Sequence, residues 1–122
     1  MKKILIAEDN KLNFSLFLLI LKGMDIEILH AEDGNEAVEL CASHPDIVLV
    51  LMDINMPNMN GEDAAVIIKT ANPNIHIISQ TAYSMTGMVS DENKWCFDDF
   101  ISKPIEVSYL KRLIDKYPLK EK

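Results

Sequence analysis

Residues 47–61 constrain the fold of this chain more than any other part of its sequence. An unbroken apolar run, residues 47–52, is followed at once by Asp53 and then by a loop rich in Pro, Asn and Gly. A short apolar run that ends in turn residues is typical of a strand buried on both faces, as in a parallel sheet. Open α/β sheets bind their ligands beyond the carboxyl ends of such strands. We therefore take Asp53 as the first candidate for a reactive group.

Strand-like and helix-like segments alternate along the whole chain. The runs that predict strands are residues 4–7, 26–31, 47–52, 75–80 and 100–102. The segments that predict helices are residues 11–22, 35–43, 62–70, 85–95 and 107–117, and the fourth of these has the weakest pattern because residues 90–94 are polar throughout. Short connections and this alternation predict a parallel sheet with helices on both faces and right-handed crossovers.

The apolar positions of the helical segments predict which faces are buried. The expected inward residues are Ala37, Leu40 and Cys41; Ala64, Ile67 and Ile68; and Leu110, Leu113, Ile114 and Tyr117. Residues 11–22 carry two apolar stripes, one with Phe14, Phe17, Leu18 and Leu21 and the other with Leu12, Leu16, Leu19 and Ile20. A surface helix needs only one such stripe. Either this helix is deeply buried or part of it meets a partner.

Length and charge set the class of protein. The chain has 122 residues, of which 48% are hydrophobic and 25% charged, and this predicts one globular domain over residues 1–122 with a frayed tail at 118–122. The net charge is −7 and the isoelectric point about 4.8, which argues against direct nucleic-acid binding. The acidity fits a cation site or simply an acidic surface.

The remaining composition predicts a cytoplasmic chain. Cys41 and Cys96 fit no CxxC or zinc spacing, so we expect reduced thiols. No apolar run reaches the length of a membrane span. The acidic residues that follow residues 4–7 come too early for a signal peptide.

Polar side chains follow four of the predicted strands. Glu8 and Asp9 follow the first, Asp53 the third, Thr81 the fourth and Lys103 the fifth. Each alone has an ordinary explanation, since a carboxylate after a strand often caps a helix and a lysine is often exposed. The carboxyl ends of parallel strands share one edge of the sheet, however, so we expect these side chains to meet in one crevice.

The chemistry of that crevice follows from its charges. Three carboxylates held close together repel one another unless a cation neutralises them. Magnesium prefers oxygen ligands and is often completed by phosphate oxygens. A lysine and a threonine add a positive charge and a hydroxyl donor, which suits stabilisation of a phosphoryl group in transfer. Asp53, at the centre, would be the nucleophile that forms an aspartyl phosphate.

Four motifs carry a resemblance to a known family. Residues 4–10, 51–61, 80–82 and 98–104 read ILIAEDN, LMDINMPNMNG, QTA and DDFISKP. Together, and at this spacing, they resemble the receiver domain of two-component response regulators over nearly the whole chain. The resemblance implies a (βα)5 flavodoxin-like three-layer fold with a five-stranded parallel sheet in the order 2-1-3-4-5.

The resemblance also implies roles for individual residues. Asp53 matches the phosphoacceptor. Asp9 and Asp53, with the backbone carbonyl of Asn55, match the ligands of a magnesium or manganese ion, and Glu8 would hold a metal-bound water.

Two further residues match the positions that engage the phosphoryl oxygens, and one matches a switch. Thr81 and Lys103 match the two residues that engage the phosphoryl oxygens, and Phe100 matches the aromatic switch. In the family, the peptide at the position of Lys103–Pro104 is typically cis. Phosphorylation would draw the Thr81 hydroxyl inward and let Phe100 turn into the vacated space. Phe100 could also be plain core.

The forms Glu-Asp-Asn and Met-Asp-Ile-Asn-Met-Pro most resemble receivers fused to hybrid sensor histidine kinases. By this resemblance, the first helix, residues 11–22, would form a docking face for histidine-bearing helices. The resemblance then places Leu16 and Ile20 inward, and Phe14 and Leu18 outward as partner-docking residues.

Residues 92–97 depart from the family pattern. Trp95 and its neighbours stand where the family usually has Ala-Gly, and Glu92 and Asn93 stand at usually apolar positions. The predicted fourth helix could therefore be short or shifted. That leaves open the usual output surface of helix four, strand five and helix five, through which a homodimer could form.

Two functions fit these residues. The first is a receiver in a phosphorelay, whose partner is a histidine kinase or a histidine phosphotransfer domain. The alternative is a stand-alone binding module that is gated by phosphorylation and passes no phosphate on. An aspartyl-phosphate phosphohydrolase would need a second Asp two residues after Asp53, where Asn55 stands. We therefore expect self-phosphorylation and self-dephosphorylation only, and not an enzyme.

Overall fold

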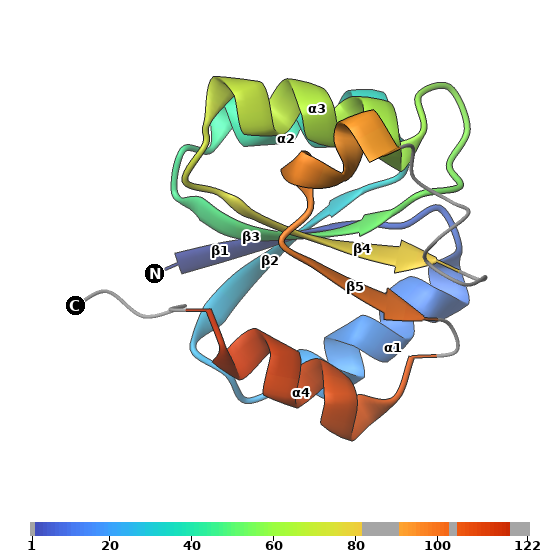
Figure 1. Cartoon of the computed structure of the whole chain (residues 1–122). Helices are drawn as coiled ribbons and strands as arrows, with labels where there is room; N and C mark the ends of the chain where they lie inside the picture. The colour runs from blue at the N-terminus through green and yellow to red at the C-terminus, as the bar shows by residue number, and fades with distance from the viewer. Residues whose placement is uncertain (1, 82–90, 103–104, 118–122) are drawn as a thin grey trace.

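The chain forms a three-layer α/β sandwich around one parallel sheet (Figure 1). The structure is a computed structural model that describes residues 2–81, 91–102 and 105–117. The strands are β1 (Lys2–Ala7), β2 (Ile26–Ala31), β3 (Ile47–Asp53), β4 (His76–Thr81) and β5 (Asp99–Ser102). They pair in parallel in the order β2-β1-β3-β4-β5, which confirms the predicted topology.

Helices cover both faces of the sheet. Figure 1 shows α1 (Lys11–Leu21) and α4 (Val107–Asp115) on one face, and α2 (Gly34–Ser43) and α3 (Gly61–Ala71) on the other. The first three helices begin at side-chain caps, because Asn10, Asp33 and Asn60 each accept a hydrogen bond from a backbone N–H three residues ahead. None of the helices in the described ranges is long and apolar enough to cross a membrane.

The core lies in two apolar layers, one on each side of the sheet. Side chains alternate along a strand, so β1 sends Ile4 and Ile6 toward α1 and α4, and Leu5 and Ala7 toward α2 and α3. Every residue of β3 except Val48 is buried, as expected for a strand between two helical layers. The predicted central strand is therefore confirmed.

The predicted phase of the first helix is only partly right. The helix buries Phe17, Ile20 and Leu21, while Leu18 is 40% exposed, so Ile20 and Leu18 lie as expected. Phe14, however, is half-buried and packs against the core layer between α1 and the sheet instead of pointing outward. Because the helix is apolar on both stripes, its sequence alone does not fix which stripe meets the sheet.

Two other predictions need correction. Ile67 of α3 was expected in the core but is 43% exposed, and Ala65 is buried in its place. A small residue lets α3 lie close to the sheet at that point. In the predicted fourth helix, residues 82–90 lie outside the described ranges, and Asp91–Cys96 forms a short 3₁₀-helix, η2, instead of an α-helix. A side-chain hydrogen bond joins η2 to α3, because Asn93 Nδ2 donates to Glu62 Oε2 at 2.6 Å.

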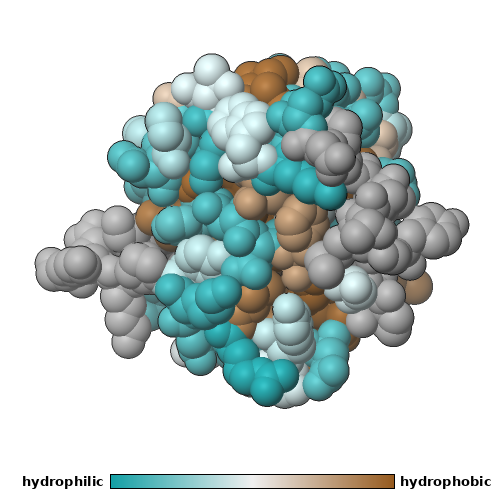
Figure 2. Space-filling view, viewed as in Figure 1, coloured by the Kyte–Doolittle hydropathy of each residue, from teal (hydrophilic) through white to brown (hydrophobic). Residues whose placement is uncertain are grey.

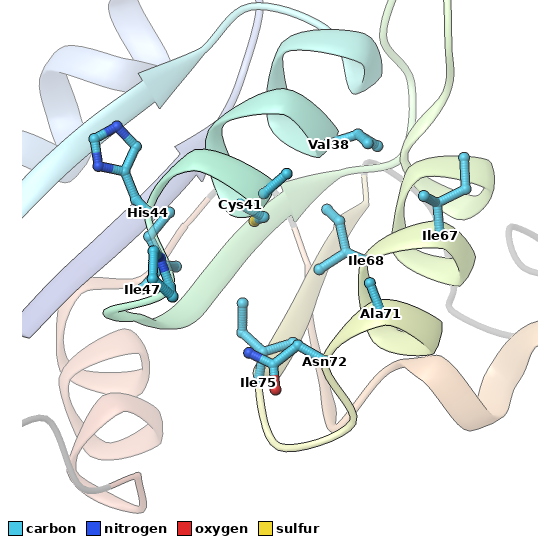
Figure 3. Close-up of a pocket in the computed structure, with 11 residues that line it drawn as sticks. Val38, Cys41, His44, Ile47, Ile67, Ile68, Ala71, Asn72 and Ile75 are labelled. Carbon is cyan, nitrogen blue, oxygen red and sulfur yellow. The ribbon is translucent and has the colours of Figure 1, made fainter.

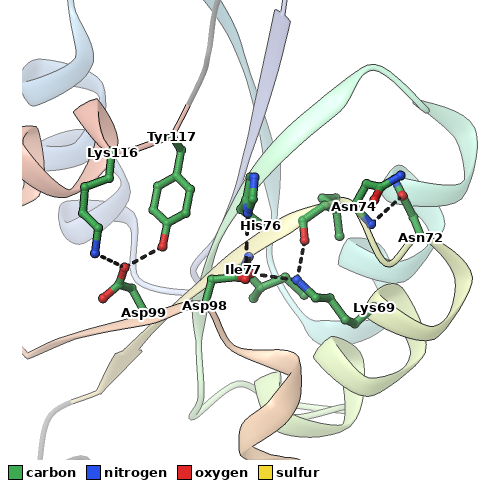
Figure 4. A network of polar contacts seen from close by, with 10 residues as sticks. Lys69, Asn72, Asn74, His76, Ile77, Asp98, Asp99, Lys116 and Tyr117 are labelled. Carbon is green, nitrogen blue, oxygen red and sulfur yellow. Dashed lines mark hydrogen bonds and ion pairs between the residues drawn. The ribbon is translucent and has the colours of Figure 1, made fainter.

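A buried ammonium group joins α3 to the starts of β4 and β5 (Figure 4). Lys69 is 9% exposed, and its Nζ donates to Ile75 O at 2.6 Å and to Asp98 Oδ2 at 2.8 Å. The same Asp98 oxygen accepts the N–H of Ile77 at 2.8 Å. One carboxylate thus ties together α3, β4 and the chain entering β5.

A second carboxylate holds the end of α4 to β5. Asp99 Oδ2 accepts from the Tyr117 hydroxyl at 2.5 Å and from Lys116 Nζ at 2.9 Å (Figure 4). Burial alone would raise the pKa of Asp99, but these hydrogen bonds hold it below its ordinary value. The carboxylate is therefore ionised at neutral pH and anchors the last helix.

We predict that Lys69→Met destabilises the fold. The substitution keeps an apolar stem but leaves Ile75 O and Asp98 without their buried donor, which costs about 1–3 kcal/mol. The free energy of unfolding from urea titration measures this loss. Lys111→Met, at an exposed position on α4, is the matched control and should change it by less than about 0.5 kcal/mol. Equal stability of the two variants would contradict the role given to Lys69.

Candidate functional site

Three carboxylates meet at the carboxyl edge of the sheet. The strands β1 and β3 are neighbours, with Ala7 paired to Met52, so the residues that follow them emerge side by side. Oxygen atoms of Glu8, Asp9 and Asp53 all lie within 4.8 Å of one another. Glu8 is fully buried and Asp53 is 3% exposed, whereas Asp9 is exposed to solvent. The predicted convergence of these three residues is confirmed.

Close backbone packing fixes the position of Asp53. A Cβ added to Gly61 would lie 2.1 Å from Asp53 O, and one added to Gly34 would lie 2.4 Å from Met59 O. Both glycines therefore allow the loop after β3 to fold back against the strand end and α2. Gly61 N also donates to Ile54 O at 3.0 Å. The Pro, Asn and Gly residues of this loop predict a turn, but they do not predict that its backbone packs directly against Asp53.

The backbone N–H of Asn55, two residues further on, holds the Asp53 carboxylate. Asn55 N donates to Asp53 Oδ1 at 3.1 Å, an Asx-type bond across the turn. This contact is one restraint on the orientation of a carboxylate whose oxygen lies within 4.8 Å of those of Glu8 and Asp9. The metal-ligand role of the Asn55 carbonyl stays a prediction.

A histidine of β2 contacts the loop that carries Glu8. His30 of β2 has its Nε2 at 2.7 Å from Glu8 O, and its ring stacks on Phe14 with centroids 3.7 Å apart and an interplanar angle of 9°. Glu8 Oε2 in turn accepts from Asn10 N at 3.3 Å. No spacing rule in the sequence links a residue of the second strand to the loop after the first.

The donor set fits a hard divalent cation. All three side chains offer carboxylate oxygens, the ligands that Mg²⁺ and Mn²⁺ accept, and their mutual repulsion falls when a cation binds. The exposure of Asp9 leaves a path from solvent. Glu8, Asp9 and Asp53 are therefore the residues that would hold the metal.

The other predicted site residues are placed in part. Thr81 ends β4, directly after Gln80, which pairs with Asp53, so its backbone lies at the same edge. Its side chain, together with Lys103 and the Lys103–Pro104 peptide, falls outside the described residues. Phe100 is half-buried, with its ring 5.6 Å from that of Phe97. Its predicted part as a switch stays a prediction.

An apolar cavity lies far from these carboxylates, at the amino ends of the strands. It has a volume of about 480 Å³ and lies between α2 and α3, where Ile47 and Ile75 mark the amino ends of β3 and β4 (Figure 3). Cys41 lines it, and burial raises the pKa of that thiol to about 12. With a protonated thiol and apolar walls, this cavity lacks the groups that phosphoryl chemistry needs.

Comparison with known proteins gives the family. The model of the response regulator receiver domain matches residues 4–115. The polar-differentiation response regulator DivK of Brucella anthropi is 34% identical over 119 residues, which cover 95% of this chain and 95% of that protein. DivK of Brucella ovis matches at the same identity and coverage.

Solved structures agree. The response regulator TrrA of Thermotoga maritima, in complex with Mg²⁺ and BeF, superposes with a TM-score of 0.84 at 33% identity and covers 95% of this chain and 98% of that one. The receiver domain of an HD domain-containing protein from Pseudomonas fluorescens has a TM-score of 0.85 at 20% identity over 94% of this chain and 85% of that one, which shows the fold alone. The strand order, the acidic edge and these matches agree that the chain belongs to the response regulator receiver domain family of two-component signalling.

Proposed function

We propose that this chain accepts a phosphoryl group on Asp53 from a phosphohistidine of a histidine kinase or a histidine phosphotransfer domain. The observation that carries the proposal is the meeting of Glu8, Asp9 and Asp53 within 4.8 Å at the end of the buried strand β3. The Thermotoga relative, whose structure contains Mg²⁺ and BeF, supports a divalent cation in this process. We expect manganese to substitute for magnesium because it accepts the same ligands.

The step is an in-line transfer. An oxygen of Asp53 forms the new bond to phosphorus while the bond between phosphorus and the histidine nitrogen breaks, and the imidazole leaves with the electron pair. The N–H of Asn55 keeps the attacking carboxylate in one orientation. Magnesium bound by Glu8, Asp9 and Asp53 would offset the negative charge of the phosphoryl oxygens. The group that becomes phosphorylated is the chain's own Asp53, and the donor is the phosphohistidine of the partner.

The exposed side of α1 is where we place the partner. Leu12 is 82%, Leu18 40% and Leu19 70% exposed, an unusual amount of apolar surface for one helix. A histidine-bearing helix could pack against these side chains and bring its phosphohistidine to the nearby site. Leu18 keeps the docking role predicted for it, whereas Phe14 is engaged by His30 inside the chain.

We place the output surface, and any homodimer contact, on η2, β5 and α4. Figure 2 shows hydrophilic side chains over α4 and hydrophobic ones between the two helical layers. Trp95 is 57%, Val107 43% and Tyr109 39% exposed around this surface. Large side chains of this kind are suited to partner contacts.

We predict that a small-molecule phosphodonor, such as acetyl phosphate, labels the parent chain only when magnesium is present. The metal is required because the attacking and transferred groups are both anionic. Intact mass should show one phosphoryl group per chain, lost in EDTA and in Asp53→Asn. Asp63→Asn, at an exposed carboxylate in α3, is the control and should label like the parent. A parent that stays unlabelled with magnesium present would refute the proposed function.

We predict that Leu18→Glu slows phosphoryl transfer from a purified phosphohistidine-bearing phosphotransfer domain by about tenfold or more. A charge placed in an apolar contact weakens docking by at least about 1.4 kcal/mol. Ile67→Glu, at a similarly exposed position on α3, should transfer at the parent rate. Both variants should still be labelled by acetyl phosphate, which needs no docking. If the two variants slow transfer equally, the partner does not bind α1.

A further inference from the structure

His30 joins three parts of the chain that lie apart in the sequence. It belongs to β2, an edge strand of the sheet, and pairs in register with Ile6 of β1. Its ring lies flat against Phe14 of α1, with centroids 3.7 Å apart. Its Nε2 lies 2.7 Å from Glu8 O, in the loop that carries two of the three site carboxylates.

The chemistry of the acceptor fixes the proton on this histidine. A backbone carbonyl can only accept, so Nε2 must carry hydrogen and donate, whatever the charge of the ring. Glu8 N separately donates to Ala31 O at 2.9 Å. Strand β2 therefore holds the Glu8 backbone by both its N–H and its carbonyl, and so helps to fix where the Glu8 side chain starts.

We propose that His30 is a positioning residue for the magnesium site and that Phe14 holds its imidazole in place. The inference rests on the proposed function, because it assumes that Glu8, Asp9 and Asp53 bind magnesium. Mg²⁺ demands near-ideal octahedral geometry, so small shifts of a loop that bears its ligands weaken binding. Groups that orient metal-binding residues by hydrogen bonds have this effect in other metal sites.

Positioning and simple packing make different demands on residue 30. Packing against Phe14 needs a flat ring, whereas positioning of Glu8 needs an N–H donor at the site of Nε2. His30→Phe keeps the ring and removes the donor. His30→Gln removes the ring and keeps a donor, since its amide nitrogen lies as many bonds from Cα as Nε2 does. The two substitutions therefore separate the two roles.

Magnesium titration by calorimetry on the folded chain tests the inference. His30→Phe should raise the dissociation constant about three- to tenfold, the loss expected for one hydrogen bond. His30→Gln should stay within about twofold of the parent. His44→Phe is the matched control, because His44 contacts Lys3 at the opposite end of the sheet, and it should bind magnesium like the parent. Should His30→Phe not fold, His30→Leu serves as the second donor-free variant.

A second readout needs no metal. The backbone N–H of Asn10 donates to Glu8 Oε2. In metal-free buffer, amide hydrogen exchange at this N–H should be faster in His30→Phe than in the parent or in His30→Gln. Unchanged affinity in His30→Phe, or equal loss in His30→Gln, would overturn the positioning role while leaving the proposed function intact. A parent that binds no magnesium would overturn both.

Discussion

The pairing of β1 with β3 is the constraint on which the rest of the structure depends. With Ala7 opposite Met52, the next residues of both strands leave the sheet at one edge, and Glu8 and Asp53 are brought together out of water. Burying carboxylates this close is costly unless a cation joins them. A divalent cation bound between these carboxylates would lower that cost, and their oxygen atoms are the ligands that such a cation accepts.

The remaining contacts keep the edge in place. Gly61 lets the loop after Asp53 return within contact of the strand, which a Cβ would prevent. At the other end of β4, the buried ammonium group of Lys69 ties α3 to the sheet through hydrogen bonds to Ile75 O and Asp98 Oδ2. The sheet is thus held at both ends of its strands, and the oxygen atoms of the three carboxylates already lie within 4.8 Å of one another.

The fold and the acidic edge could be predicted because both depend on local signals. Apolar runs of strand length, followed by Asp9 or Asp53, specify where strands stop, and parallel topology then brings the ends together. The errors lie where burial depends on tertiary packing. Ile67 was assigned to the core by its helical spacing, yet the sheet meets the neighbouring Ala65. The contact from His30 to Glu8 joins β2 to the loop after the neighbouring strand β1 and leaves no periodic trace in the sequence.

The central claim is that these strand ends assemble an oxygen-lined magnesium site with Asp53 as the phosphoacceptor. A crystal structure of the chain grown with magnesium and beryllofluoride tests it most directly. The account predicts a metal ion at about 2.1 Å from carboxylate oxygens of Asp9 and Asp53, with beryllofluoride on Asp53. An ordered carboxylate edge without the ion, at saturating magnesium, or beryllofluoride on another residue, would contradict it.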